Sequence, residues 1–141
     1  MRWYYWPLWV WAAPLTAFGL LWTKFIYKAH TYRYHDGVFS CLSPNIWGSG
    51  IIAQTLGACI VYKNETWRSN VPVRVHEHVH VKQCLYGGIL LPLAYFSASL
   101  WIYWRRKDLW AAYRANPFEV AAYDYDRAFR QGKLTEVPWG A

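Results

Sequence analysis

Two long stretches without a charged residue constrain this chain most strongly. The first extends from Trp3 to Thr23 and the second from Leu85 to Trp104. Each is long enough to cross a membrane, since about 20 apolar residues span a bilayer. Pro7, Pro14 and Gly19 interrupt the first stretch, and aromatic residues replace much of the usual Leu and Ile. We therefore expect this stretch to be either a membrane anchor, spanning or lying on the surface, or a buried aromatic segment of the core.

The charges beside the first stretch predict an orientation for the case in which it spans. Lys24, Lys28 and Arg33 follow the stretch, whereas only Arg2 and the terminal amine precede it. Positive residues favour the cytoplasmic side, so the rest of the chain would face the cytoplasm. In the second stretch Gly87, Gly88 and Pro92 break the pattern, and a helix is expected from Leu93 onward.

Composition excludes several classes of protein. The chain has 141 residues, of which 55% are hydrophobic and 21% aromatic, so it is too apolar to be disordered. Its three cysteines are an odd number without a CxxC spacing, which argues against a disulfide scaffold or a zinc ribbon. The net charge of +7 is spread along the chain, with one cluster at residues 105–107. That cluster follows an apolar stretch and suits a membrane edge or a helix end better than a nucleic-acid surface.

Turn and capping residues predict an α+β chain. Residues 30–50 are expected to be largely irregular, with short strands at Val38–Leu42 and Ala58–Tyr62 and a loop at Lys63–Asn70. Helices are expected from Asp108 to Ala115 and from Asn116-Pro117 to Gly132. We divide the chain into an apolar aromatic N-terminal segment, residues 1–30, and a metal-binding domain, residues 31–141.

The segment Val73–Gln83 carries the clearest chemistry and has two interpretations. As a strand, it would place three histidines on one face and bury Glu77 among valines without a partner, which costs several kcal/mol. As a helix, it would stack His76 and His80 on one face with Glu77 beside them. Asn70 and Pro72 before the segment and Gly87-Gly88 after it are typical of the two ends of a helix, and they favour this second interpretation.

In helical form the segment is the pattern H-E-x-x-H, in which two imidazoles bind zinc and the glutamate acts on the metal-bound water. Such a zinc ion needs a third protein ligand. The acidic residues downstream are Asp108, Glu119, Asp124, Asp126 and Glu136. His78 points away from the pair and is expected to be structural or to lie at the surface.

Two motifs together resemble a known family. The segment His76–Gln83, followed by Asn116–Tyr123, is similar to the gluzincin branch of zinc metallopeptidases. In particular it resembles small bacterial zincin-like proteins in which HExxHxxQ precedes an N-P-x-E-x-x-A helix. Thr55–Tyr62 is similar to the strand before the metal helix in such proteins. The resemblance covers about residues 36–130 and implies a zincin-like α+β fold, with a small sheet packed on the HExxH helix and further C-terminal helices.

The resemblance also implies roles for individual residues. His76, His80 and Glu119 would bind Zn²⁺, Glu77 would be the general base, and Gln83 would orient a ligating imidazole. The implied function is a zinc-dependent metallopeptidase, a hydrolase acting on a peptide or protein substrate. We expect no nucleic-acid partner, a membrane surface or a single N-terminal anchor as a further contact, and a cytoplasmic or membrane-associated location with the metal site facing the cytoplasm.

Other interpretations stay open on the sequence alone. Glu119 stands three residues after Asn116, so the two residues could form a capping box that needs no metal. Asp124 or Asp126 would then take its place as ligand. The chain could also be a non-catalytic metal-stabilised module, or a membrane-associated protein whose histidines are incidental. For the residue that stabilises the oxyanion, Tyr123, Tyr86 and His35 are candidates.

The prediction that Glu119 is the third ligand constrains where the second apolar stretch can lie. If Leu85–Trp104 crossed a bilayer, Glu119 would lie about 30 Å from His80 unless the chain folded back. With Glu119 as a ligand, this stretch is expected to belong to the core or to make a shallow membrane contact.

Overall fold

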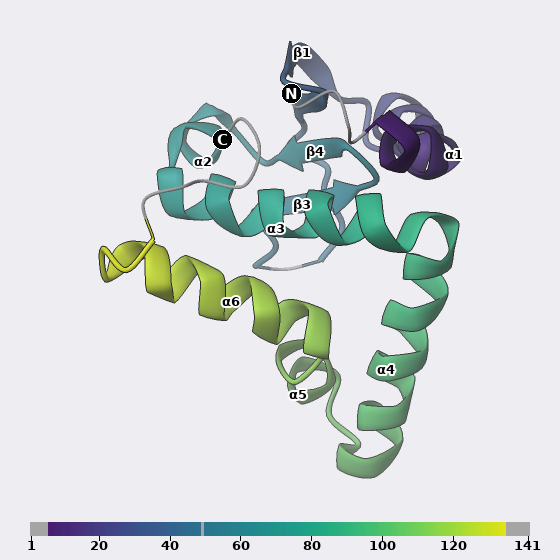
Figure 1. Cartoon of the computed structure of the whole chain (residues 1–141), viewed down its shortest axis with the longest axis vertical. Helices are drawn as coiled ribbons and strands as arrows, with labels where there is room; N and C mark the ends of the chain where they lie inside the picture. Colours follow the sequence, from purple (N-terminus) through teal and green to yellow (C-terminus); the bar gives the residue numbers. More distant parts are fainter. Residues whose placement is uncertain (1–5, 49, 135–141) are drawn as a thin grey trace.

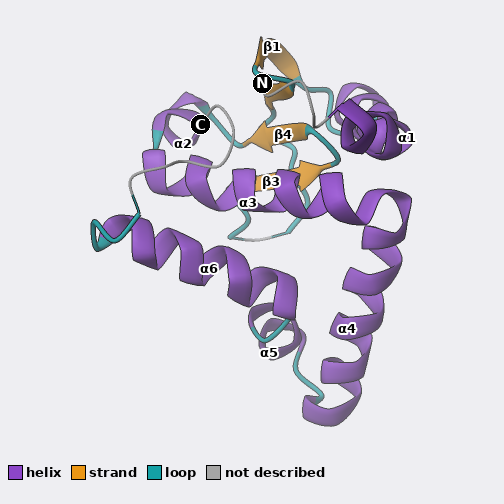
Figure 2. Ribbon diagram, in the orientation of Figure 1, coloured by secondary structure: helices purple, strands orange, loops and turns teal. Residues whose placement is uncertain are grey.

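The computed structural model describes residues 6–48 and 50–134, which form a mixed α+β fold with a small sheet and several helices (Figures 1 and 2). The elements in chain order are α1 (Trp6–Phe25), β1 (His30–His35), β2 (Val38–Leu42), β3 (Ala53–Leu56), β4 (Cys59–Tyr62), α2 (Glu65–Ser69), α3 (Val71–Gly87), the short 3₁₀ helix η2 (Gly88–Leu90), α4 (Leu91–Arg106), α5 (Leu109–Arg114) and α6 (Pro117–Arg130).

The sheet has four strands in the order β1-β2-β4-β3. β2 and β4 are parallel, and the two outer pairs are antiparallel. All four residues of β4 are buried, as its apolar sequence predicts. β1 and the helix α2 lie in segments that we expected to be irregular or looped. Those expectations were wrong because pairing with β2 orders β1, and an Asn64 cap begins α2.

Helix α1 packs on the sheet through a stripe of small residues. Its buried positions are Ala12, Leu15, Gly19 and Thr23. Gly19 allows the closest approach, since a Cβ atom there would lie 2.3 Å from the carbonyl oxygen of Leu56. Other large apolar side chains of α1, among them Val10, Phe18 and Leu21, are exposed. The helix is therefore neither fully buried in the core nor separate from the domain.

Helix α3 begins and ends where the capping residues predict. The Asn70 side chain accepts a hydrogen bond from the backbone N–H of Val73, and Gly88, at φ 51°, is the C-cap. The strand interpretation of this segment was wrong, because the cap and the α-helical bonds satisfy its backbone along its whole length. A Cβ atom on Gly88 would lie 2.2 Å from the Trp11 ring, so this turn brings η2 against α1.

Helix α4 leaves the body of the domain at a sharp bend, and the chain returns through α5 and α6 (Figure 1). None of its 16 described residues is buried, so the expectation that this helix belongs to the core was wrong. Asp108 caps α5, Asn116 caps α6, and α6 packs along α3. The chain therefore folds back and brings Glu119 to the histidine pair. By length and composition, the helical stretch Val71–Arg106 could cross a membrane.

Candidate metal centre

Two histidines on α3 point their ring nitrogens at each other. His76 and His80 are one helical turn apart, and their Nε2 atoms are separated by 3.2 Å. Residues four apart on a helix share a face, so this juxtaposition follows directly from the spacing. The two rings are half-buried in the groove between α3 and α6, with 12% and 13% of their side-chain surface exposed.

Glu119 reaches both histidines from α6. Its Oε2 atom lies 3.6 Å from Nε2 of His76, and its Oε1 atom lies 3.5 Å from Nε2 of His80. Ligand atoms bound tetrahedrally at about 2.1 Å from a metal are about 3.4 Å apart. The 3.2 Å between the two imidazole nitrogens is close to this value, and one ligand atom from each of the three residues lies within 4.8 Å of the others, so the group could hold a metal ion.

The burial of Glu119 also fits a cation. Only 5% of its side-chain surface is exposed, and Oε2 is a buried atom without a hydrogen-bond partner among the described residues. A buried carboxylate oxygen is normally paired, since leaving it without a partner costs free energy. A metal ion held between Glu119 and the histidines would satisfy it. Asn116 instead caps α6 through the N–H of Phe118, so Glu119 is not used for a capping box.

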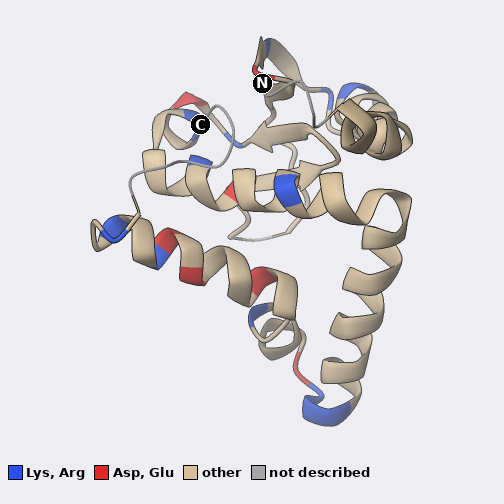
Figure 3. Cartoon of the chain, viewed as in Figure 1, with Lys and Arg blue, Asp and Glu red and all other residues tan. Residues whose placement is uncertain are grey.

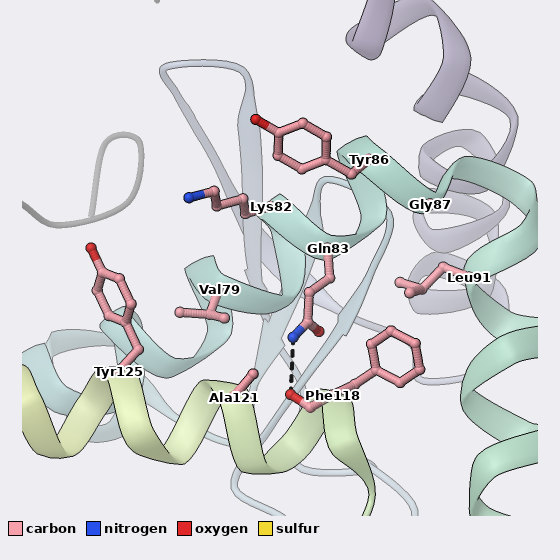
Figure 4. Close-up of a pocket in the computed structure, with 9 residues that line it drawn as sticks. All are labelled: Val79, Lys82, Gln83, Tyr86, Gly87, Leu91, Phe118, Ala121 and Tyr125. Carbon is pink, nitrogen blue, oxygen red and sulfur yellow. Dashed lines mark hydrogen bonds between the residues drawn. The ribbon is translucent and has the colours of Figure 1, made fainter.

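Gln83 fixes the orientation of the His80 ring. The Nδ1 atom of His80 lies 2.9 Å from Oε1 of Gln83, and the Gln83 amide donates to the carbonyl of Phe118 at 2.9 Å (Figure 4). Because the Gln83 NH₂ group donates to Phe118, its Oε1 atom accepts from Nδ1–H of His80. Nε2 of His80 is then free to act as the ligand atom. This agrees with the position expected for Gln83 from the HExxHxxQ pattern.

A second orienting contact comes from α4. The hydroxyl of Tyr95 donates to Oε1 of Glu119 at 2.8 Å. The Asn116 amide donates to the Tyr95 carbonyl and to the Ser99 hydroxyl, at 3.0 and 2.7 Å, which fixes α4 against the start of α6. The sequence analysis did not select Tyr95, because no local spacing relates it to the H-E-x-x-H helix.

Glu77 points to the sheet side of α3. It is 6% exposed, and its Oε2 atom accepts a 2.6 Å hydrogen bond from the hydroxyl of Thr55 on β3. Glu77, His80 and Glu119 line one cavity of about 290 Å³. Tyr113 and Phe96 form part of its remaining wall. The cavity thus contains a buried carboxylate beside the group of metal-binding side chains.

The charges of the centre are coupled. Burial of the His80 ring lowers its pKa, but the Glu119 and Glu77 carboxylates outweigh burial and raise it to about 9. Burial raises the pKa of Glu119, but the neighbouring His76 and His80 rings outweigh this effect and hold it well below its usual range. Without a metal, His80 therefore holds a proton beside an ionised Glu119.

The other candidates lie elsewhere. His78 donates from Nδ1 to the Arg74 carbonyl at 2.7 Å, and burial lowers its pKa to about 4, as suits a structural histidine. Asp124 and Asp126 pair with Arg127 and Arg130 on the surface of α6. These two aspartates are therefore not the third ligand.

Two of the three proposed oxyanion donors lie away from the centre. Tyr86 lies on a groove on another side of α3 (Figure 4), and His35 is exposed on β1. Tyr123 does reach the centre, with its ring 4.6 Å from that of His76. Tyr113, which the sequence did not indicate, lines the cavity itself.

Comparison of the chain with protein families, with characterised proteins and with solved structures finds no match.

Proposed function

We propose that this protein is a zinc-dependent hydrolase of the metallopeptidase type, with a zincin-like arrangement of the H-E-x-x-H helix and the sheet. The observation that carries the proposal is the convergence of His76, His80 and Glu119, of which His80 and Glu119 line one cavity together with the buried Glu77. Two imidazoles and one carboxylate are a ligand set typical of catalytic zinc, which keeps a further position open for water or substrate.

The residues of the chain have distinct roles in this proposal. Zinc, when bound, lowers the pKa of a coordinated water and polarises the substrate carbonyl. Glu77 accepts the proton of the attacking water and passes it to the leaving amine. Thr55 holds the Glu77 carboxylate through its 2.6 Å hydrogen bond, so the base is oriented before substrate binds. Gln83 and Tyr95 orient the metal ligands.

Tyr113 is the best-placed candidate to stabilise the oxyanion. It lines the cavity. Burial, followed by the nearby Glu119 charge, raises its pKa, so the hydroxyl keeps its proton at neutral pH. A neutral hydroxyl facing the cavity can donate a hydrogen bond to the developing negative oxygen.

The proposed substrate is an extended peptide that pairs with β3. β4 cannot offer its backbone to a substrate, because it lies between β2 and β3 and is already paired on both sides. β3 is, with β1, one of the two edge strands of the described sheet, and its Thr55 bonds to Glu77. An exposed strand edge binds an extended peptide through its main chain. The adjacent apolar residues Leu91 and Phe96 would receive a substrate side chain.

The proposal is tested with Glu77→Gln. The zinc-loaded protein is incubated with a mixed peptide library, and new peptide termini are identified by mass spectrometry. We expect cleavage by the wild type and a loss of roughly 10²–10⁴-fold in the variant, with zinc content unchanged. The matched control Asp124→Asn removes an exposed carboxylate on α6 and should cleave like the wild type. Undiminished cleavage by Glu77→Gln would exclude Glu77 as the base.

A non-catalytic metal-stabilised module is the alternative. It uses the same three ligands and predicts bound zinc without cleavage in any peptide mixture. In that case Glu77→Ala would change the free energy of unfolding, and there would be no rate of peptide cleavage for it to lower.

A further inference from the structure

Helix α4 turns polar side chains toward the body of the protein and exposes apolar ones, which is the reverse of a helix in a water-soluble domain. The residues that face the body include Tyr95 and Ser99, which bond to Glu119 and Asn116. Leu93 and Leu100 point the other way and are 68% and 67% exposed. A helix on the surface of a soluble protein buries its apolar side and exposes its polar side.

Helix α1 repeats this inverted pattern. Its inward side carries Gly19, Thr16, which accepts a hydrogen bond from the N–H of Ala58, and the buried Thr23. Val10 and Leu21 lie on the outward side and are 63% and 57% exposed. The two helices thus present large apolar side chains to the outside and use small or hydroxyl side chains to pack.

Helices α1 and α4 lie on the same side of the molecule (Figure 1). α1 packs against η2, and η2 leads directly into α4. In Figure 1 α1 is seen along its axis and α4 runs down the picture, both on the same side of the molecule. We call this surface the apolar face; its main residues are Val10, Phe18, Leu21, Leu90, Leu93 and Leu100, each more than half exposed.

The charges at the border of this face match an anionic membrane. Residues 6–23 and 91–104 carry no charge, and Figure 3 shows α4 free of charged residues until its last turn. Lys24 and Lys28 follow the apolar part of α1, and Arg105, Arg106 and Lys107 follow that of α4. Basic residues beside an apolar surface bind anionic headgroups.

Aromatic residues mark the same border. The Arg105 guanidinium lies 4.6 Å from the centre of the Trp101 ring, and Trp104 beside it is 63% exposed. Tryptophan favours the boundary between headgroups and acyl chains. This end of α4 is therefore suited to the interface of a bilayer.

We propose that the protein docks on an anionic lipid bilayer through its apolar face, with α1 and α4 lying along the membrane surface. The 16 residues of α4 measure about 24 Å, which is shorter than the roughly 30 Å of a bilayer core. The longer stretch Val71–Arg106 bends at Gly88, and its first half holds the metal-binding histidines. Docking along the surface inserts both apolar sides and keeps the metal centre outside the bilayer.

The test is flotation on a density gradient. The full-length protein is first exchanged from detergent into vesicles of 70% phosphatidylcholine and 30% phosphatidylglycerol. We expect the wild type to float with these vesicles. The double variant Leu93→Glu/Leu100→Glu should partition at least tenfold more weakly. The matched control Val71→Glu, a 42% exposed valine at the far end of α3, should float like the wild type. Removing the three charges at residues 105–107 by changing each to Gln should weaken partition roughly a hundredfold.

A measurement on the wild type alone separates the remaining outcomes. Bromine-labelled lipids quench tryptophan at known depths. Stronger quenching by bromines near the headgroup supports surface docking, whereas stronger quenching by bromines near the bilayer centre would overturn it in favour of a spanning arrangement. Wild-type protein that stays out of the vesicles as a dimer would also overturn it, because a second copy would then cover the apolar face. Peptide cleavage is not needed for either readout, so this proposal and the proposed function fail independently.

Discussion

The hydroxyl of Tyr95 on α4 donates a 2.8 Å hydrogen bond to Oε1 of Glu119 on α6. This bond connects the helix that carries much of the apolar face to the third residue of the candidate metal centre. The bond uses Oε1 of the Glu119 carboxylate, and Oε2 is one of the buried side-chain atoms without a hydrogen-bond partner in the described part of the chain.

Removing this hydroxyl should weaken metal binding. In Tyr95→Phe the ring stays and the hydrogen bond is lost, so the Glu119 carboxylate is less well oriented. Losing such an outer contact typically lowers metal affinity about 10–100-fold. Zinc affinity is measured by competition with a chelator. Tyr86→Phe, a change at an exposed tyrosine on α3, is the control, and equal affinities for the two variants would contradict this role of Tyr95.

The purified protein should hold about one zinc ion per chain. His80→Ala and Glu119→Ala should lose it, because each removes one of three ligands, while Asp124→Asn should retain it. Metal content is measured by atomic emission. If the folded wild type stays free of zinc after zinc is supplied, the centre is a protonated histidine–carboxylate cluster and not a metal site.

Zinc should also stabilise the fold. Free metal at 1,000 times its dissociation constant adds about 4 kcal/mol to the free energy of unfolding. Chelation should therefore lower the melting temperature of the wild type and leave that of His80→Ala unchanged. Equal shifts in both proteins would mean that the chelator acts elsewhere.

Zinc affinity should rise with pH. The raised pKa of His80, about 9, means that its ring is protonated at pH 7 in the metal-free protein, and zinc must displace this proton. Below pH 9 the apparent affinity should therefore increase about tenfold per pH unit, and above pH 9 it should level off. Competition titrations between pH 6.5 and 9.5 measure the slope, and a flat profile between pH 7 and 8.5 would show that His80 is already neutral.

Gly19→Ala should destabilise the protein although alanine is the better helix former. Propensity alone would favour the variant by about 1 kcal/mol. The added Cβ atom would meet the Leu56 carbonyl at 2.3 Å and force α1 away from β3. We expect a net loss of about 1–3 kcal/mol in the free energy of unfolding. Denaturant unfolding measures it, and a gain in stability would mean that α1 is not held at this contact.

The parts of the molecule that the sequence predicted are those with local causes. Asn70 and Gly88 determine where α3 begins and ends, and the spacing of His76 and His80 then places both rings on one face. Asp108 and Asn116 likewise cap the two C-terminal helices. Each of these features depends on residues within about one helical turn.

Features that depend on distant partners were missed or left open. The short strand β3 has a weak pattern, and it is ordered by pairing with β4. Thr55 and Tyr95 belong to the centre only because β3 and α4 are packed beside α3 and α6. The exposure of α4 was also unpredictable, because an uncharged apolar run is equally compatible with a buried core and with a membrane contact.

The sequence by itself determined the ligand-bearing helix, its capped ends and the apolar character of α1 and α4, since these follow from residue type and short-range spacing. Only the tertiary structure decided that Glu119, rather than Asp124 or Asp126, meets the histidines, and that β3 rather than β4 forms the open edge. It also decided that the apolar sides of α1 and α4 face outward together. These outcomes depend on how the chain folds back after α4, and no local pattern encodes that path.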